Sequence, residues 1–292
     1  MRIGVEIETL CEFMPDAGIG EYHDGQAVDE LNTIGGSQWV AESDSSLSPA
    51  DGEHGIEFVS PCFAFNASNI AKLSKSITEI HNAFGARTNR SCGVHINVSL
   101  APLNSQSYRR MMFISRLFQQ GAYASTGSTT RETGSYARPL RELSYSGNDA
   151  MCEGDYGNED RCNWVNLVHI SKRGKSTANN SRCEYRVFSG SLDPKRIISW
   201  CQFAQCLAHY STDLNGITPV VPIARPKNVG EGRYHLDCLL ESMGWLSGNS
   251  TNTKWVQNDV VKLSESVLIL QNLADVYDVK KFQIGNSSGG IH

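Results

Sequence analysis

The stretch Gly4-Val5-Glu6-Ile7-Glu8 decides how the rest of the chain is interpreted. In an extended strand, alternate side chains point to opposite faces, so Glu6 and Glu8 share one face and Val5 and Ile7 share the other. Two neighbouring carboxylates repel one another unless a cation lies between them. Because oxygen ligands suit a hard cation, this stretch predicts a strand that holds magnesium or manganese. Taken alone, it is equally typical of a half-exposed strand with two solvated glutamates.

Three later segments repeat this arrangement, with functional polar groups on one face and β-branched or aromatic residues on the other. The polar groups are Glu57, then His95 with Asn97, then Glu184 with Arg186. A histidine ligand remains compatible with magnesium or manganese, and the planar fork of an arginine suits phosphate. A sheet with these groups on one face either faces water or lines a site. The segments are Gly55-Ile56-Glu57-Phe58-Val59, Cys92-Gly93-Val94-His95-Ile96-Asn97-Val98 and Cys183-Glu184-Tyr185-Arg186-Val187-Phe188.

The composition is that of an ordinary soluble globular protein. Of the 292 residues, 40% are hydrophobic and 20% are charged. No apolar run approaches the length of a membrane span, and the N-terminus lacks a basic and then apolar signal segment. Nine cysteines without a close CxxC pair favour reduced thiols. We therefore expect a cytoplasmic protein without a membrane partner.

The net charge of −5 hides an asymmetry along the chain. Residues 1–60 contain thirteen acidic residues and a single base, Arg2, whereas residues 101–145 contain six arginines and two acidic residues. This distribution is typical of a cleft that holds metal on one side and phosphate on the other, although chance and surface solubility also explain it. A nucleic-acid partner is disfavoured, because no dense stripe of basic and aromatic residues is present.

The order of the elements predicts an α+β fold, in which helices pack behind a curved antiparallel sheet that lines an active-site cleft. Long loops inside a compact domain are usually functional or mobile, and two are expected, at 14–37 and 121–160. The remaining predicted elements are strands at 39–42 and 164–169, and helices from Asn66 or Ser68 to Gly85, through 111–118, after Asp193-Pro194, and at about 233–246 and 257–276.

A segment rich in proline and glycine, residues 215–232, is interpreted as a linker that crosses the surface. We therefore expect a catalytic core at 1–214 and a helical extension packed on it at 215–284. Residues 285–292 are expected to form a flexible tail.

Five motifs, in this order along the chain, resemble those of the amidoligase family. That family belongs to the carboxylate–amine ligases with the fold of glutamine synthetase and glutamate–cysteine ligase. The resemblance covers about residues 1–210, and the C-terminal third resembles no family that we can name. The motifs are Gly4-Val5-Glu6-Ile7-Glu8, Asp44-Ser45-Ser46-Leu47, Gly55-Ile56-Glu57-Phe58-Val59-Ser60-Pro61, Cys92-Gly93-Val94-His95-Ile96-Asn97, and Glu184-Tyr185-Arg186-Val187-Phe188 followed by Gly190-Ser191-Leu192-Asp193.

The resemblance implies a catalytic domain like that of glutamine synthetase and an ATP-dependent ligase. A carboxylate would attack the γ-phosphate of ATP to give an acyl phosphate, and an amine or ammonia would then displace phosphate to form an amide. The resemblance also implies two to three Mg²⁺ or Mn²⁺ ions. Their implied ligands are Glu6, Glu8, Glu57, His95 and Glu184.

Other roles are carried over from the same resemblance. Arg186 resembles the arginine that neutralises the developing phosphoryl charge, and Arg186 and Asn97 would contact the nucleotide. Asp44 would lie beside the metal or the incoming amine, and Arg138 would hold a substrate carboxylate or a phosphate. The implied partners are a small-molecule or peptide carboxylate and an amine or ammonia, which arrives free or from a separate glutamine amidotransferase.

The physical chemistry of the residues agrees with this interpretation. Phosphoryl transfer depends on positioning and charge neutralisation, which divalent ions and an arginine supply. The chain lacks the Gly-x-x-x-x-Gly-Lys-Ser/Thr motif of P-loop enzymes, and no Gly-x-Gly-x-x-Gly follows a strand, which disfavours a Rossmann site.

Several alternatives stay open. A phosphagen-type kinase would use the same combination of magnesium and arginines on a guanidine or amine, and a non-catalytic relative would bind only nucleotide and metal. A Cys92–His95 hydrolase is less favoured, because a three-residue offset in a strand sends side chains to opposite faces. A zinc site is disfavoured by irregular spacings; its candidate ligands are Cys152, Cys162, His169 and Cys183.

Overall fold

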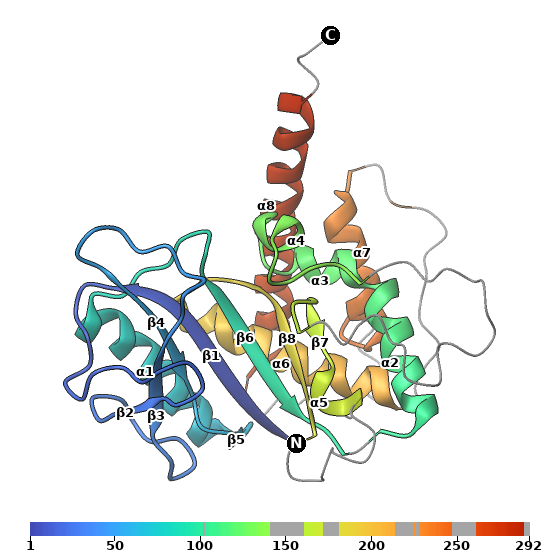
Figure 1. The fold of residues 1–292 in the computed structure, drawn as a ribbon. Helices are drawn as coiled ribbons and strands as arrows, with labels where there is room; N and C mark the ends of the chain where they lie inside the picture. Colours follow the sequence, from blue (N-terminus) through green and yellow to red (C-terminus); the bar gives the residue numbers. More distant parts are fainter. Residues whose placement is uncertain are drawn as a thin grey trace.

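A computed structural model gives the fold (Figure 1). It describes residues 1–101, 103–140, 161–171, 181–213, 225, 228–246 and 261–288, without the side chains of 105, 171 and 285–288. None of the helices in these ranges combines the length and the apolar character that a membrane crossing requires.

The described strands form one eight-stranded antiparallel sheet, with β1 near its centre. The order is β2-β3-β4-β1-β6-β8-β7, and β5 pairs with β1. Every pairing between the named strands is antiparallel. The strands are β1 (Arg2–Cys11), β2 (Gln26–Val28), β3 (Trp39–Ser43), β4 (His54–Val59), β5 (Phe63–Ala64), β6 (Gly93–Ser99), β7 (Val165–Asn166) and β8 (Arg182–Ser189).

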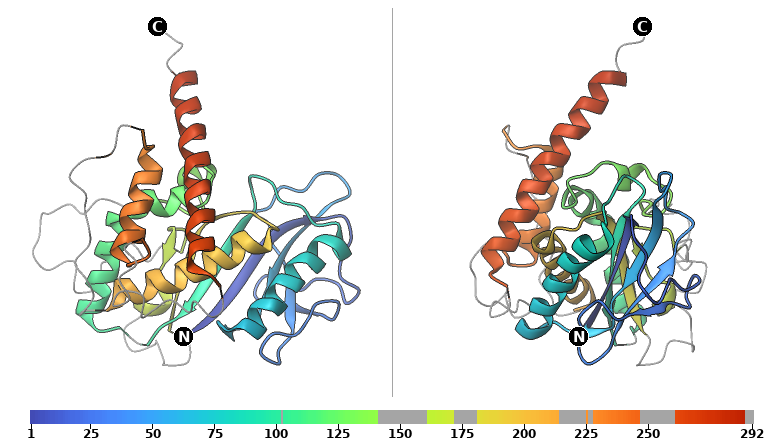
Figure 2. Two further views of the ribbon diagram at one scale, coloured as in Figure 1. Left: turned by 180° about the vertical axis from the view of Figure 1, so that it is seen from behind. Right: turned by 90° about the vertical axis from the view of Figure 1, so that its left-hand side faces the viewer.

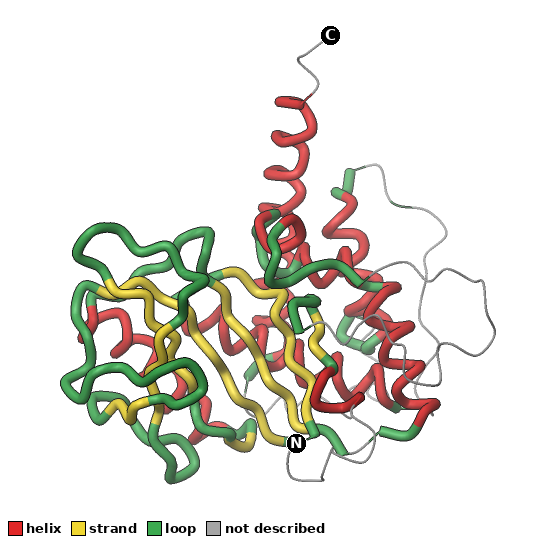
Figure 3. The backbone as a smooth tube through the Cα atoms, viewed as in Figure 1, coloured by secondary structure: helices red, strands yellow, loops and turns green. Residues whose placement is uncertain are grey.

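Helices α1 (Ala67–Phe84) and α6 (Pro194–Thr212) cover one face of this sheet, as Figures 2 and 3 show. The alternation of β1 sends Val5 and Ile7 to this face, where both are fully buried. Aromatic stacking joins the layers, with ring centroids 5.2 Å apart for Phe58 and Phe84 and 5.1 Å apart for Phe188 and Trp200. The opposite face of the sheet is therefore left for the polar side chains.

The ends of both helices follow from local sequence. The Asn66 side chain accepts a hydrogen bond from the backbone N–H of Asn69, which identifies Asn66 rather than Ser68 as the N-cap of α1. Gly85, at φ 57°, ends α1 in the left-handed conformation that glycine adopts readily. Asp193 caps α6, and Pro194 occupies its first turn, as predicted.

The remaining described helices gather beyond the β8 side of the sheet, and α8 projects away from the body of the molecule (Figures 1 and 2). They are α2 (Ser105–Leu117), α3 (Gln119–Ala124), α4 (Thr130–Thr133), α5 (Val168–Ser171), α7 (Glu231–Ser242) and α8 (Leu263–Ser288). The mixed α/β class with an antiparallel sheet and packed helices is confirmed.

Several predicted boundaries are wrong, and the loop predicted at 14–37 contains strand β2 (Gln26–Val28). The strand predicted at 164–169 is limited to Val165–Asn166, because the Asn166 side chain accepts the Val168 N–H and turns the chain into α5. The loop predicted at 121–160 contains the end of α3 and all of α4, and its residues 141–160 lie outside the described ranges.

The last predicted helix, 257–276, is also displaced. Helix α8 begins at Leu263 and continues through Ser288, into the segment expected to be a flexible tail. Residues 285–288 have weak helix formers such as glycine and asparagine, so their sequence gave no sign of this continuation. The predicted domain boundary at 214 lies in a segment outside the described ranges.

Candidate active site

Three glutamates lie directly opposite one another on the polar face of the sheet. Glu57 on β4 pairs with Glu8 on β1 and with Glu42 on β3. Like charges directly opposite in a sheet are destabilising, because their carboxylates are held a few ångströms apart. A row of this kind suggests that the protein uses the negative charge to hold a cation.

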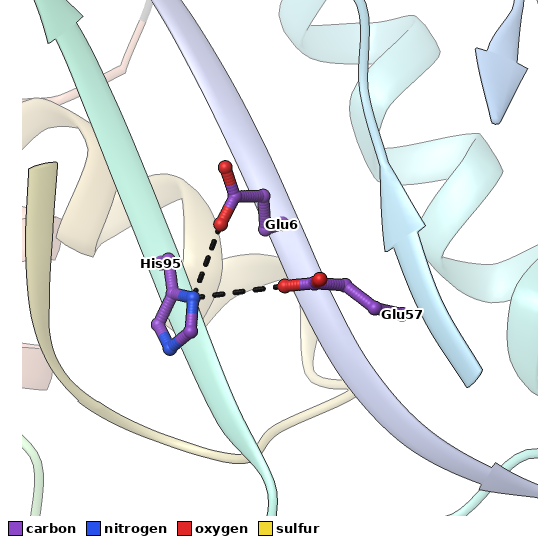
Figure 4. A group of neighbouring side chains, drawn as sticks. All are labelled: Glu6, Glu57 and His95. Atoms are coloured by element: carbon purple, nitrogen blue, oxygen red, sulfur yellow. Dashed lines mark hydrogen bonds and ion pairs between the residues drawn. The ribbon is translucent and has the colours of Figure 1, made fainter. Parts of the chain in front are cut away.

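The next row brings an imidazole to the same place. Glu6 on β1 pairs with His95 on β6, and Nδ1 of His95 lies 3.1 Å from Oε2 of Glu6 and 3.7 Å from Oε1 of Glu57 (Figure 4). One potential ligand atom from each of Glu6, Glu57 and His95 lies within 4.8 Å of the other two. This separation allows a single ion to contact all three side chains.

Burial makes it energetically unfavourable for these glutamates to be ionised. The side chains of Glu8 and Glu57 are 5% and 8% exposed. Burial, reinforced by the charges of Glu6 and Glu8, raises the pKa of Glu57 from 4.5 to about 10. Without a cation Glu57 is therefore held protonated at neutral pH, and a divalent ion would reverse this effect.

The His95 ring is neutral and is held from both sides. Burial, with a smaller contribution from Arg186, lowers the pKa of His95 from 6.5 to about 4. Nε2 lies 3.3 Å from Oε1 of Glu8, whose other oxygen accepts the backbone N–H of Gly93. When Nε2–H donates to Glu8, the lone pair of Nδ1 points toward Glu6 and Glu57. A carboxylate that fixes a histidine in this way is typical of metal sites.

Glu184 and Arg186 complete the site from β8. Nδ1 of His95 lies 3.6 Å from Oε1 of Glu184, and the same oxygen is paired with Nη1 of Arg186. The amide of Asn166 donates to the other Glu184 oxygen at 2.7 Å. The Arg186 side chain is 17% exposed, so part of its guanidinium remains accessible to a ligand.

A β-bulge separates the polar side chains of β8 from the core residue that follows them. Val94 of β6 pairs with Phe188 of β8, but Ile96 pairs with Tyr185 instead of Arg186. Two residues of β8, Arg186 and Val187, therefore lie opposite the single residue His95. Strict alternation would place Phe188 on the face of Glu184 and Arg186, whereas the extra residue turns Phe188 into the core. Bulges often re-aim side chains beside active sites.

A second layer of polar side chains supports the ligands. The amide of Asn97 donates to Oε1 of Glu6 at 2.8 Å, and its oxygen accepts from Nε of Arg182 at 3.1 Å. Arg182 also contacts Nε2 of His169 at 2.9 Å. These contacts hold Glu6 in place, although its side chain is 24% exposed.

A pocket of about 630 Å³ opens over this face, and both acidic and basic side chains line it. Tyr22 and His23, from the loop predicted at 14–37, also line it. Its described acidic lining residues are Glu6, Glu8, Glu42, Asp44, Glu57 and Glu184, and its arginines are Arg161, Arg182 and Arg186.

The structure brings together most of the residues predicted from sequence. All five predicted metal ligands line the pocket, with Asp44 and Arg186. Asn97 lies behind Glu6 and is not among the lining residues. Arg138 is exposed, lies in a bridge with Asn163, and is not among the described residues that line the pocket.

Three positions at the candidate site were not predicted. Glu42 lies on the face opposite the buried Trp39 and Ala41, and Arg182 lies two residues before Glu184. Both follow the alternation of their strands and line the pocket, so a signal was present. Arg131, which contacts the back of His95, comes from a short helix in a segment rich in glycine, serine and threonine. No periodicity could have identified it.

The cysteine alternatives find little support in the described residues. Cys92 packs with Leu10 and Leu47, and burial raises the pKa of its thiol, which is unfavourable for a nucleophile. Cys183 is fully buried in the apolar core, whereas Cys162 and His169 line the pocket. Cys152, the other proposed zinc ligand, lies outside the described ranges.

The donor set fits the predicted ions. Carboxylate oxygens and one imidazole suit Mg²⁺ or Mn²⁺, and the described cluster offers no thiolate that would favour a softer metal. The buried carboxylates opposite one another give an independent reason for a cation, since a cation would relieve the repulsion that helps to keep Glu57 protonated.

Comparison with known proteins agrees with the motifs. No curated protein matches the chain. The family described as "Putative amidoligase enzyme" matches residues 1–208, which include every strand of the sheet and all of the residues that surround the carboxylate–imidazole cluster. The chain therefore belongs to this amidoligase family.

Proposed function

We propose that this protein is an ATP-dependent ligase that joins a carboxylate to an amine or ammonia through an acyl phosphate. The observation that carries the proposal is the cluster of Glu6, Glu57 and His95 beside the Glu184–Arg186 pair on one pocket face. It combines a cation site with an arginine in a chain of the amidoligase family.

The residues divide into three roles. Glu6, Glu57 and His95 would hold one divalent ion, and Glu8 and Glu184 would orient this cluster or contact a second or third ion. When bound, the ions neutralise the phosphate oxygens of ATP. Arg186 would stabilise the charge that develops on the transferred phosphoryl group, because part of its guanidinium reaches the pocket.

In the first step, an oxygen of the substrate carboxylate forms a bond to the γ-phosphorus, and the bond to the leaving ADP breaks. The amine nitrogen then attacks the acyl carbon, and phosphate leaves with the electron pair of the broken C–O bond. Asp44 lies at the pocket wall beside Ser45 and Ser46, where its carboxylate can attract an ammonium and accept a proton. Its oxygen already accepts the Ser46 N–H at 2.7 Å, which fixes its direction.

The substrates would be a small-molecule or peptide carboxylate and an amine. Tyr22 and His23 line the pocket with ring centroids 3.7 Å apart, so the loop that carries them contributes to substrate choice. Ammonia would arrive free or from a separate glutamine amidotransferase.

ADP release, measured with Mg²⁺ or Mn²⁺ over pooled acids and amines, tests the proposal. We expect ADP formation that requires both an acid and an amine, together with an amide product detected by mass spectrometry. Arg90→Ala is a useful control, because Arg90 is exposed and is not among the described residues that line the pocket. A stable phosphorylated product that forms without amide would instead identify a kinase and contradict the ligase proposal.

A further inference from the structure

Two adjacent residues of the short helix α4 contact different parts of the molecule. Arg131 points to the back of the His95 site, and Glu132 contacts helix α8, about which the family match to residues 1–208 says nothing. This arrangement links the C-terminal helix to the candidate active site through one turn of chain.

The Arg131 guanidinium lies in a tight and buried position. The residue is 6% exposed, its Nη2 donates to the carbonyl oxygen of Arg186 at 2.6 Å, and Nη2 lies 3.5 Å from Nε2 of His95. A Cβ atom on Gly93 would lie 2.7 Å from Nη2 and 2.8 Å from Cζ. The glycine of the Cys92-Gly93-Val94-His95 motif therefore leaves the space that the guanidinium occupies.

A buried guanidinium needs a counter-charge, because its desolvation is costly. Glu8 supplies this counter-charge, because its negative charge interacts electrostatically with Arg131. Oε1 of Glu8 also lies 3.3 Å from Nε2 of His95. Arg131 and Glu8 thus flank the same ring nitrogen. The positive charge of Arg131 attracts Glu8, which also accepts the Gly93 N–H, and Glu8 in turn holds the ring with Nδ1 toward Glu6 and Glu57.

Helix α8 contacts the other side of α4 through Glu132. The hydroxyl of Tyr277, a fully buried residue, donates to Oε2 of Glu132, and Nζ of Lys281 lies 3.2 Å from Oε1. Nζ of Lys281 also lies 3.0 Å from the Tyr277 hydroxyl, and Lys280 donates to the carbonyl of Gly127 at 2.7 Å, just before α4.

We propose that helix α8 is a positioning element of the active site, and that it acts through Glu132 and Arg131 to set the orientation of His95. The proposal rests on the proposed metal-dependent function of the site. It gives the C-terminal helix a role in metal affinity rather than only in stability. Arg131 is a positioning residue, because it contacts His95 and Arg186 and is not among the described residues that line the pocket.

Tyr277→Phe is the informative variant, because it keeps the buried ring and removes only the hydroxyl that holds Glu132. Asp275→Asn is the matched control. It lies on the same helix and removes an ion pair of 2.8 Å, but that pair is with Arg233 on α7. Both full-length proteins are compared with wild type by circular dichroism and thermal melting before any binding measurement.

Two measurements follow. Mn²⁺ titration monitored by electron paramagnetic resonance gives the affinity of the site, and the ¹⁵N NMR signals of the His95 ring, assigned with a His95→Asn variant, report which nitrogen carries the proton. We expect Tyr277→Phe to weaken Mn²⁺ binding by up to about fivefold, the effect of one hydrogen bond, and to broaden or shift the His95 signals. Arg131→Met is expected to weaken Mn²⁺ binding by about 10-fold or more, and Arg131→Lys is expected to weaken it less.

The outcomes separate this inference from the proposed function. If the folded Tyr277→Phe and Arg131→Met variants bind Mn²⁺ like wild type, with unchanged His95 signals, the positioning role is wrong and the ligase proposal stands. An equal loss in Asp275→Asn would also overturn it, because the effect would then be general to α8. If wild-type protein itself binds no Mn²⁺, the metal-dependent function fails instead.

Discussion

Replacing Glu57 by glutamine is expected to stabilise the metal-free protein above neutral pH and to remove most of its affinity for Mn²⁺. Glu57 lies opposite Glu8 and Glu42, and glutamine keeps its shape without the charge. Groups that bind a ligand through repelling charges commonly reduce the stability of the free protein.

The magnitude follows from the pKa of Glu57, which is raised from 4.5 to about 10 in the folded protein. Between these values the folded protein holds a proton that the unfolded chain has released, so the free energy of unfolding decreases as the pH rises. The slope for one proton is about 1.4 kcal/mol per pH unit, or up to about 2.7 kcal/mol between pH 7 and pH 9. For a chain of this size that corresponds to a decrease of roughly 5–10 °C in Tm.

His95 does not obscure this trend. Its pKa is lowered from 6.5 to about 4, so its contribution to stability is lost as the pH falls below 6.5 and is complete above it. Of these two groups, therefore, only Glu57 changes the free energy of unfolding with pH above pH 7.

Differential scanning calorimetry in EDTA, at several pH values from about 7 to 9, is the appropriate assay. The Tm of wild type should decrease with pH, and that of Glu57→Gln should decrease less. Some decrease remains in the variant near pH 9, because burial also raises the pKa of thiols such as those of Cys11 and Cys238. Saturating Mn²⁺ should reduce the decrease in wild type to that of the variant. A metal-free wild type whose Tm does not change with pH, or a variant that decreases equally, would refute the reasoning.

Three further predictions concern the same site. Glu184→Gln and Arg186→Ala should each lower kcat by about 10²-fold or more while circular dichroism and Tm stay close to wild type; unfolding of both variants would show a structural role instead. Gly93→Ala should destabilise the protein by about 1–3 kcal/mol, because its Cβ meets the Arg131 guanidinium, and combining it with Arg131→Ala should restore part of this loss in denaturant melts. Chelation of divalent ions should abolish ADP release and Mn²⁺ should restore it, whereas activity that persists in EDTA would exclude a metal-dependent reaction.

The strands of the site were predictable because alternation is a property of local sequence. Glu6, Glu57, His95 and Glu184 each sit among apolar neighbours with a period of two, and sheet pairing then brought their faces together. The same rule would have included Glu42, had it been applied to every predicted strand.

Other features depend on contacts that local sequence does not contain. The bulge opposite His95 shifts the pairing of β6 with β8 by one residue. The alternation of apolar and polar residues in β8 does not predict this shift. Arg131 approaches from the short helix α4, whose Glu132 contacts Tyr277, 145 residues later in the chain. Arg138 is exposed and is not among the described residues that line the pocket, so its role in binding substrate stays a prediction.

The position of β1 at the middle of the sheet has a consequence for how the protein would acquire the proposed metal ion. Glu6 is synthesised before Glu57 and His95, which follow 51 and 89 residues later along the chain. The Glu184 strand, which completes the wall, is made later still. The nascent chain therefore has no ion-binding cluster to guide its early collapse, and loading must wait until the distant strands have paired. Metal availability should accordingly affect how long the finished protein persists rather than how fast it folds.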